Sequence, residues 1–291
     1  MDGFRFSSFA VVAMACLLAA CSVHDAWRGD GVRAKARPTE TGAEVAEHLQ
    51  RRFDAKLDDC GSATRPAFLC SGILMRSTEY SATYHSWIPN PNTAPWGISF
   101  SWLRQDSDFD ENYPSDNGFI VYPRFYADDG NYDLLTVRCA FPFDAWTGAP
   151  DRCNTSGHPG LCQKHGVTNA FQWIAKYTDN SNQCAFDVNP SAPDTAFAWT
   201  QMVTVRQLKN SFDRNEIILA AWAQNTHARM PLEAFFYRTN GVGSALNDAR
   251  SDQRDFRATA GRWVPIIRWT PTVGAARATF TYNVADQAIL N

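Results

Sequence analysis

The sequence lacks the short motifs that mark several common enzyme classes. It contains no G-x-S-x-G, no H-E-x-x-H and no phosphate-binding P-loop, so a hydrolase nucleophile elbow, a zincin and a P-loop enzyme are all unsupported. It has no block of lysines and arginines, and its formal net charge is −3, which gives no case for nucleic-acid binding. It also lacks internal repeats and low-complexity tracts.

Aromatic residues, by contrast, are abundant. They make up 13% of the chain, and ten of them are tryptophan, while 45% of the residues are hydrophobic and 20% are charged. This composition is typical of a globular, strand-rich domain and suits stacking on a ring-bearing ligand. We expect a single α+β domain over residues 41–291.

The first 40 residues have the features of an export signal followed by a tether. The apolar run from Phe9 to Ala20 is too short to span a bilayer and suits a signal peptide over residues 1–20. It ends in Leu18-Ala-Ala-Cys21, which fits the lipoprotein pattern and predicts lipidation of Cys21. An ordinary signal peptide cut nearby is the alternative. Residues 21–40 are polar and form the expected tether, so we expect an outer-membrane lipoprotein or a secreted protein.

Cysteine usage agrees with export. Six cysteines follow the signal region: Cys60, Cys70, Cys139, Cys153, Cys162 and Cys184. An even number in an exported chain predicts disulfides, although six cysteines allow about fifteen pairings. Short loops favour Cys60–Cys70 and Cys153–Cys162, which leaves Cys139 with Cys184. A zinc site is the alternative, but the chain lacks a CxxC pair. Oxidised cysteines argue against a cysteine nucleophile.

Periodicity and turn residues predict the elements of the fold. Thr41 and Glu44 form a capping box at the start of a helix that runs to about Leu57 and packs under a sheet. Further helices are expected at 169–177, with Phe171 and Ile174 facing inward, and at 194–208, 215–224 and 252–259, the last closed by Gly261. Strands are expected at 72–75, 97–103, 119–122, 134–139, 230–237, 263–269 and 278–284. The fold class is therefore α+β, with a mixed or antiparallel sheet and a helical insertion.

A chemically suggestive set of residues begins in the stretch from Cys70 to Arg104. Arg76 ends one strand, and Ser99 and Ser101 share one face of the next, while Glu233 begins a late strand. Cleavage of an N-glycosidic bond has an oxocarbenium-like transition state, which a carboxylate stabilises. A guanidinium can hold a diphosphate, and small hydroxyls can orient the carboxylate. Tyr84, His85, Trp87 and Arg104 complete the candidate substrate-binding residues.

Simpler roles remain open for each of these residues. Arg76 and Glu233 can be ordinary sheet-edge charges, the serines can face solvent, and Arg104 can pair with Asp106 to hold a loop. The acidic cluster Asp106, Asp108, Asp110 and Glu111 can be a calcium site, but it lacks the glycine of an EF-hand loop, so a plain surface loop is favoured. We predict no metal and no bound cofactor.

Several blocks resemble the halovibrin family of secreted bacterial proteins: Asp59–Gly61, Arg65–Gly72, Tyr84–Trp87, Gly97–Arg104, Asn117–Ile120, Gln183–Val188 and Pro231–Tyr237. They span nearly the whole chain after the tether. The family is described as NAD-degrading, with ADP-ribosyl transfer also proposed. The resemblance therefore implies an enzyme that takes NAD or a related dinucleotide as substrate.

Arg76, the Ser99–Ser101 strand and Glu233 also resemble, in order, the Arg, Ser-x-Ser and Glu trio of ADP-ribosyltransferase toxins, which implies an ADP-ribosyltransferase-like fold. Ser-Phe-Ser replaces the usual Ser-Thr-Ser, and Pro231 stands where transferases usually have Glu or Gln to activate the acceptor. The second departure favours water as acceptor. The expected function is an NAD glycohydrolase; the alternatives are ADP-ribosylation of a protein and a non-enzymatic envelope lipoprotein that binds a glycan or a partner.

Overall fold

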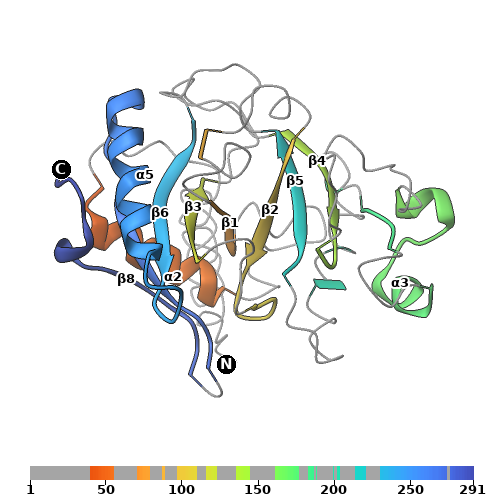
Figure 1. Ribbon diagram of the computed structural model, residues 1–291. Coiled ribbons are helices and arrows are strands. Elements are labelled where there is room, and N and C mark those ends of the chain that lie inside the picture. Colours follow the sequence, from red (N-terminus) through yellow and green to blue (C-terminus); the bar gives the residue numbers. More distant parts are fainter. Residues whose placement is uncertain are drawn as a thin grey trace, which may run out of the picture.

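The fold is seen in a computed structural model (Figure 1). It describes residues 40–55, 71–78, 87–88, 97–109, 116–122, 136–144, 161–176, 183–186, 188, 199, 202–203, 214–220, 230–273 and 276–291. The signal segment, residues 21–39 of the tether including Cys21, and Cys60, Cys70 and Cys153 lie outside these residues, and so does most of the helix expected at 194–208.

One eight-stranded sheet forms the centre of the fold, in the order β4-β5-β2-β1-β3-β6-β7-β8. Neighbouring strands are antiparallel except β6 and β7, which are parallel, so the sheet is mixed and the predicted α+β class is confirmed. The strands are β1 (Ile73–Ser77), β2 (Ile98–Leu103), β3 (Asn117–Val121), β4 (Thr136–Phe141), β5 (Glu216–Ala220), β6 (Leu232–Arg238), β7 (Ile266–Thr270) and β8 (Thr279–Tyr282).

Helix α2 (Gly42–Asp54) covers one face of the sheet, which we call the α2 face. The predicted capping box is present, since the Thr41 hydroxyl accepts from the Glu44 backbone N–H and the Glu44 carboxylate accepts from the Thr41 N–H. Apolar side chains of α2, including Leu49 and Phe53, pack with Met75 and other residues of the sheet. The helix ends three residues before the predicted Leu57.

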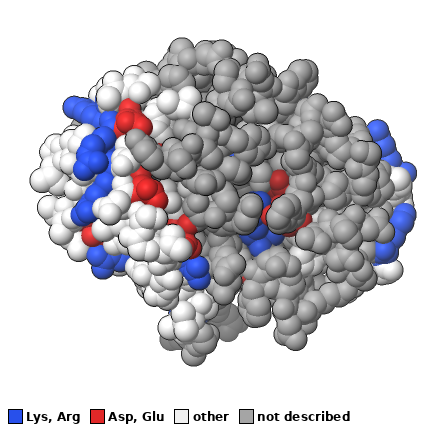
Figure 2. Space-filling model, in the orientation of Figure 1, with Lys and Arg blue, Asp and Glu red and all other residues white. Residues whose placement is uncertain are grey.

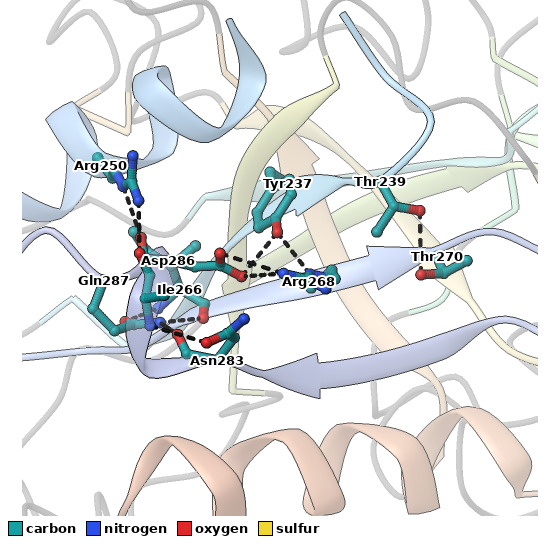
Figure 3. Close-up of polar contacts among 10 residues, drawn as sticks. Tyr237, Thr239, Arg250, Ile266, Arg268, Thr270, Asn283, Asp286 and Gln287 are labelled. Carbon is teal, nitrogen blue, oxygen red and sulfur yellow. Dashed lines mark hydrogen bonds and ion pairs between the residues drawn. The ribbon is translucent and has the colours of Figure 1, made fainter. Parts of the chain in front are cut away.

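Helix α5 (Ala245–Ala260) covers the opposite face, which we call the α5 face. Figure 3 shows the sheet between the two helices, with α5 above and α2 below. The helix is twice as long as the segment expected at 252–259, and it closes at Gly261, whose φ of +68° is the left-handed value that favours glycine. Its inner residues Ala249 and Phe256 pack with alternate residues of the strands, such as Phe119 and Phe235.

The helix expected at 215–224 is wrong, because strand β5 begins at Glu216. Ile217, Ile218 and Leu219 pair with β2 on one side and with β4 on the other. Both faces of this central strand are buried, so its sequence is a continuous apolar run without the alternation of a half-exposed strand. Two isoleucines in that run fit a strand better than a helix.

The helical insertion contains the short 3₁₀ helix η4 (Cys162–His165) and helix α3 (Ala170–Lys176), on the right of Figure 1. Helix α3 lies within the predicted range, and Ile174 packs against the core as predicted, but Phe171 is exposed and Trp173 is buried instead. A disulfide joins Cys162 to Cys184. This bond contradicts both the predicted Cys153–Cys162 and Cys139–Cys184 pairings, although Cys139 is also disulfide-bonded.

A polar cluster fixes the C-terminal segment against β6 and β7 (Figure 3). The Tyr237 hydroxyl donates to Asp286 at 2.8 Å, and Arg268 bonds both of them, while Arg250 donates to the carbonyl of Asp286. Burial raises the pKa of Tyr237, and the bond to Asp286 raises it further.

The last strand, β8, is shorter than the predicted range 278–284 and is followed by the 3₁₀ turn η7 (Val284–Asp286). Among the described helices, none has the length and apolar character needed to cross a membrane.

Candidate active site where two strands part

The candidate site lies where β1 and β2 stop pairing with each other. They pair only from Ile73 opposite Leu103 to Met75 opposite Ser101. Beyond that point β1 continues to pair with β3, and β2 continues to pair with β5. The strands therefore part directly beside three of the predicted site residues, Arg76, Ser99 and Ser101.

Arg76 connects the two strands at this point. In the β1–β3 register it lies opposite Phe119, so its backbone position is on the α5 face. Its Nη1 donates to the carbonyl oxygen of Ser99 at 2.6 Å, and the residue is buried. This bond places the guanidinium of Arg76 at the backbone of the Ser99–Ser101 strand, whose serine side chains share the α2 face with Met75.

Ser99 and Ser101 hold a second guanidinium, which the sequence analysis did not single out. The Nη1 of Arg214 donates to the Ser99 hydroxyl at 3.2 Å and to the Ser101 hydroxyl at 3.3 Å. Its Nη2 pairs with the carboxylate of Asp144 at 2.7 Å, and both side chains are largely buried. Its Nε–H is buried without a hydrogen-bond partner.

Glu216, the first residue of β5, is the acidic residue nearest to the serines in the sheet. Phe100 lies opposite Ile217, so the next pair in the same register is Ser101 and Glu216. Residues opposite each other share a face, with Cβ atoms about 5 Å apart. Glu216 is buried and lies opposite Phe141 on its other side.

Asn215 fixes this register with its side chain. Its amide group donates to the carbonyl of Trp102 at 2.7 Å and accepts from the Trp102 N–H at 2.8 Å. The buried amide thus takes the place of a backbone partner at the end of β2. Because strand residues alternate, Arg214 and Glu216 project to the face opposite that of Asn215, which is the face of the serines.

Glu233 lies elsewhere, although on the same face of the sheet. Ile120 pairs with Ala234 and Val121 with Leu232, so Glu233 is the extra residue of a β-bulge that turns it toward α2. Its carboxylate contacts the Nδ1 of His48 at 3.1 Å and Nη1 of Arg52 at 3.3 Å. Strands β1 and β3 separate β6 from β2, which places Glu233 about 14 Å from the serines at the usual strand spacing of ~4.8 Å. The predicted set of Arg76, the serines and Glu233 is therefore not brought together.

Two of the predicted substrate-binding residues are built into the protein interior. Arg104 is fully buried; it forms two hydrogen bonds to Asp106, one of 2.7 Å, donates to the Ser71 hydroxyl and lies over the ring of Trp102. The alternative that Arg104 and Asp106 form an ion pair is thus confirmed. Trp87 packs edge-to-face on Phe256 in the core. Tyr84 and His85 lie outside the described residues.

A buried carboxyl group lies close to the end of β1. The Thr78 hydroxyl donates to Asp252 of α5 at 2.9 Å and accepts from the side-chain amide of Asn117 at 3.0 Å. Burial raises the pKa of Asp252 to about 7, although the bond from Thr78 acts in the opposite direction. The neighbouring Asp255 and Asp248 add to the increase. This carboxyl group joins α5 to the residues that follow Arg76.

Figure 2 shows a small group of acidic and basic atoms near the middle of the view, while more charged residues lie at its left and further basic residues at its right. The site combines two arginines, two serine hydroxyls and two carboxylates, those of Asp144 and Glu216. Such a set can hold an anionic ligand and stabilise a developing positive charge.

Asn215 and Glu216 were missed because residues 215–224 were predicted to form a helix, and Arg214 lies directly before that range. The signal that could have located them is the run Ile217-Ile218-Leu219, since a polar Arg-x-Glu pair directly before a buried strand places both side chains on one face.

Within the described ranges, no group of three or more His, Cys, Asp or Glu side chains forms a metal site. The chain matches no protein-family model and no curated protein.

Proposed function

We propose that this protein is an NAD glycohydrolase, distantly related to the halovibrin family, whose catalytic carboxylate is Glu216. The observation that carries the proposal is the register that puts Glu216 beside Ser101 on one face of the sheet where β1 and β2 part, with Arg76 bonded from the α5 face to the carbonyl of Ser99. The same residue types in the same order occur in the trio that the sequence analysis compared with ADP-ribosyltransferase toxins. In this proposal the carboxylate of the trio is Glu216 on β5, in place of Glu233 on β6.

Each residue has a role that its chemistry supports. Cleavage breaks the bond between nicotinamide nitrogen and the ribose anomeric carbon, and the electron pair leaves with nicotinamide. The positive charge left on the ribose is stabilised by the carboxylate of Glu216. Arg76 holds the diphosphate, and the buried Nε–H of Arg214 is available to a substrate oxygen. Water adds to the anomeric carbon and releases one proton to solvent, giving ADP-ribose.

The residue two positions before the carboxylate favours water as the acceptor. In the transferases of the trio this position is usually Glu or Gln, which can activate an acceptor. Here it is Arg214, whose guanidinium accepts no proton and is already bound to Asp144 and both serines. Pro231, two positions before Glu233, likewise has no side-chain group that could activate an acceptor.

Nicotinamide release by the purified chain, with Cys21→Ser to remove the lipid, tests the proposal. We expect wild type to release nicotinamide from NAD, Glu216→Gln to lose at least about 100-fold in kcat (~3 kcal/mol), and Glu233→Gln to retain its rate per folded molecule. Labelled NAD offered with and without a mixed protein substrate separates hydrolysis from transfer. Loss with Glu233→Gln alone would return the role to Glu233, and no release by wild type would overturn the NAD proposal.

A further inference from the structure

We propose that Gln183 is a positioning residue for the candidate site, because it holds Asp144 in place and, through Asp144, the guanidinium of Arg214. It acts through the backbone of Phe143, the residue directly before Asp144. The inference rests on the proposed function only for its effect on nicotinamide release. The positioning itself is measured independently, as a coupling between the stability losses of two variants.

The side-chain amide of Gln183 binds the backbone of Phe143 in the way that a neighbouring strand would. The N–H of Phe143 donates to Oε1 of Gln183 at 3.2 Å, and Nε2 of Gln183 donates to the Phe143 carbonyl at 2.9 Å. Both residues are buried, and the ring of Phe143 packs against that of Trp173 in α3. Buried backbone groups need partners, so removal of the amide forces this part of the chain to move toward others.

Asp144 links Phe143 to the site. Its backbone N–H donates to the carbonyl of Arg214 at 2.9 Å, and its carboxylate pairs with Nη2 of the same residue at 2.7 Å. Nη1 of this guanidinium donates to the two serine hydroxyls. A displacement of Phe143 therefore moves the carboxylate that holds one side of the guanidinium, while the serines hold the other side.

Gln183 is itself fixed by its neighbours in the sequence. Cys184 is joined to Cys162 by the disulfide. Phe186 exchanges two backbone hydrogen bonds, of 2.9 and 2.7 Å, with Ala140 of β4, the end strand of the sheet. Figure 1 shows α3 beyond this strand. The helical insertion and its disulfide thus support the site from outside the strands that carry the serines.

The chain offers a matched control in Gln287. The N–H of Ile266 donates to its Oε1 at 2.8 Å, and its Nε2 donates to the Ile266 carbonyl at 2.9 Å. Ile266 begins β7, which β1, β3 and β6 separate from β2. Gln183→Ala and Gln287→Ala therefore remove the same pair of bonds, and both should lower stability, but only the first change reaches Arg214.

The first experiment measures kcat and KM for nicotinamide release per folded molecule. We expect Gln183→Ala to lose about tenfold in kcat, because a small misplacement of a site residue is costly, with little change in KM, since Arg76 still holds the diphosphate. Gln287→Ala should stay within about twofold of wild type. If Gln183→Ala keeps the kcat of Gln287→Ala, its role is structural only and the inference is overturned.

The second experiment is a double-mutant cycle on stability, measured with urea. For Gln183→Ala and Asp144→Ala, the combined loss in the folding equilibrium constant should fall short of the product of the single losses by about threefold or more, because both act on one network. For Gln287→Ala and Asp144→Ala the losses should multiply. Losses that multiply in both pairs would show that Gln183 does not hold Asp144.

The two experiments separate this inference from the proposed function. If wild type releases no nicotinamide, the proposed function fails, and the stability cycle alone decides whether Gln183 positions Asp144. If Gln183→Ala does not fold, Gln183→Met, which keeps most of the volume and neither hydrogen bond, replaces it in both experiments. The same outcomes then support or overturn the role.

Discussion

Glu216 and Glu233 are both buried acidic residues of the central sheet, yet their surroundings differ. Glu233 projects from a bulge of β6 onto α2, where His48 and Arg52 both contact its carboxylate. Glu216 opens β5 beside two serine hydroxyls and an arginine that is shared with Asp144. A buried carboxylate that contacts a histidine and an arginine of a packed helix attaches that helix to the sheet. A carboxylate next to small hydroxyls, where strands part, is placed to act on a ligand.

The largest effect on stability should come from Glu233→Gln. The change leaves Arg52 buried without its counter-charge, and burial already lowers the pKa of Arg52 against the opposing influence of Glu233. Breaking a buried ion pair by removing one partner costs about 3–5 kcal/mol. We expect the free energy of unfolding, measured with urea, to fall by that amount.

The matched control for this prediction is Glu47→Gln on the same helix, where the carboxylate is exposed and pairs with Arg51. It should change the free energy of unfolding by less than about 0.5 kcal/mol. If Glu233→Gln unfolds at the same urea concentration as wild type but loses nicotinamide release, the two carboxylates have exchanged the roles given to them above.

Much of the fold could be predicted from the sequence because its signals are local. The capping box at Thr41 and Glu44 lies within four residues, and Gly261 marks the end of α5 in the sequence. Seven of the eight strands fall on predicted runs. The eighth, β5, is buried on both faces, and its apolar run carries no period that distinguishes a strand from a helix.

The site was harder to predict because most of its residues are far apart in the sequence and are brought together only by the order of the strands in the sheet. Arg76 and the serines lie on neighbouring strands close in sequence, and Arg76 is bonded to the backbone carbonyl of Ser99. Glu233 was chosen because it begins a strand, but the sequence does not show that β1 and β3 separate that strand from β2. Asp144 and Arg214 are 70 residues apart, and nothing in the sequence indicates their contact.

Asp252→Asn should have the next largest effect on the free energy of unfolding, and the size of this effect depends on pH. The pKa of Asp252 is raised from 3.8 to about 7 in the folded state, so folding favours the protonated form. That stability is fully present below about pH 4 and is lost as pH rises to 7, because the folded state must then hold a buried charge. Asparagine keeps an acceptor for Thr78 and carries no charge.

We therefore expect the free energy of unfolding of wild type to decline relative to Asp252→Asn between pH 4 and 7, by a few kcal/mol in total. Above pH 7 the difference should stay constant, with the variant the more stable. The exposed Glu47→Gln on α2 is the control, since Glu47 is not among the charges that raise the pKa of Asp252. Parallel stability curves for wild type and Asp252→Asn would mean that this carboxyl group ionises normally, and that α5 is not joined to β1 by a protonated acid.

The smallest expected loss of stability is that of Thr41→Ala. This variant tests whether weakening α2 affects stability without affecting nicotinamide release. Loss of the N-cap hydroxyl should cost about 1 kcal/mol of unfolding free energy, whereas Thr41→Ser, which keeps the cap, should cost a few tenths. Nicotinamide release should not change, because α2 contacts Glu233 and not the serines or Glu216 among the described residues. Combined with Glu233→Gln, the cost of Thr41→Ala should shrink if α2 is already partly detached. If the two costs add fully, the contacts of Glu233 do not hold α2 on the sheet. Glu233 would then lack the structural role that distinguishes it from Glu216.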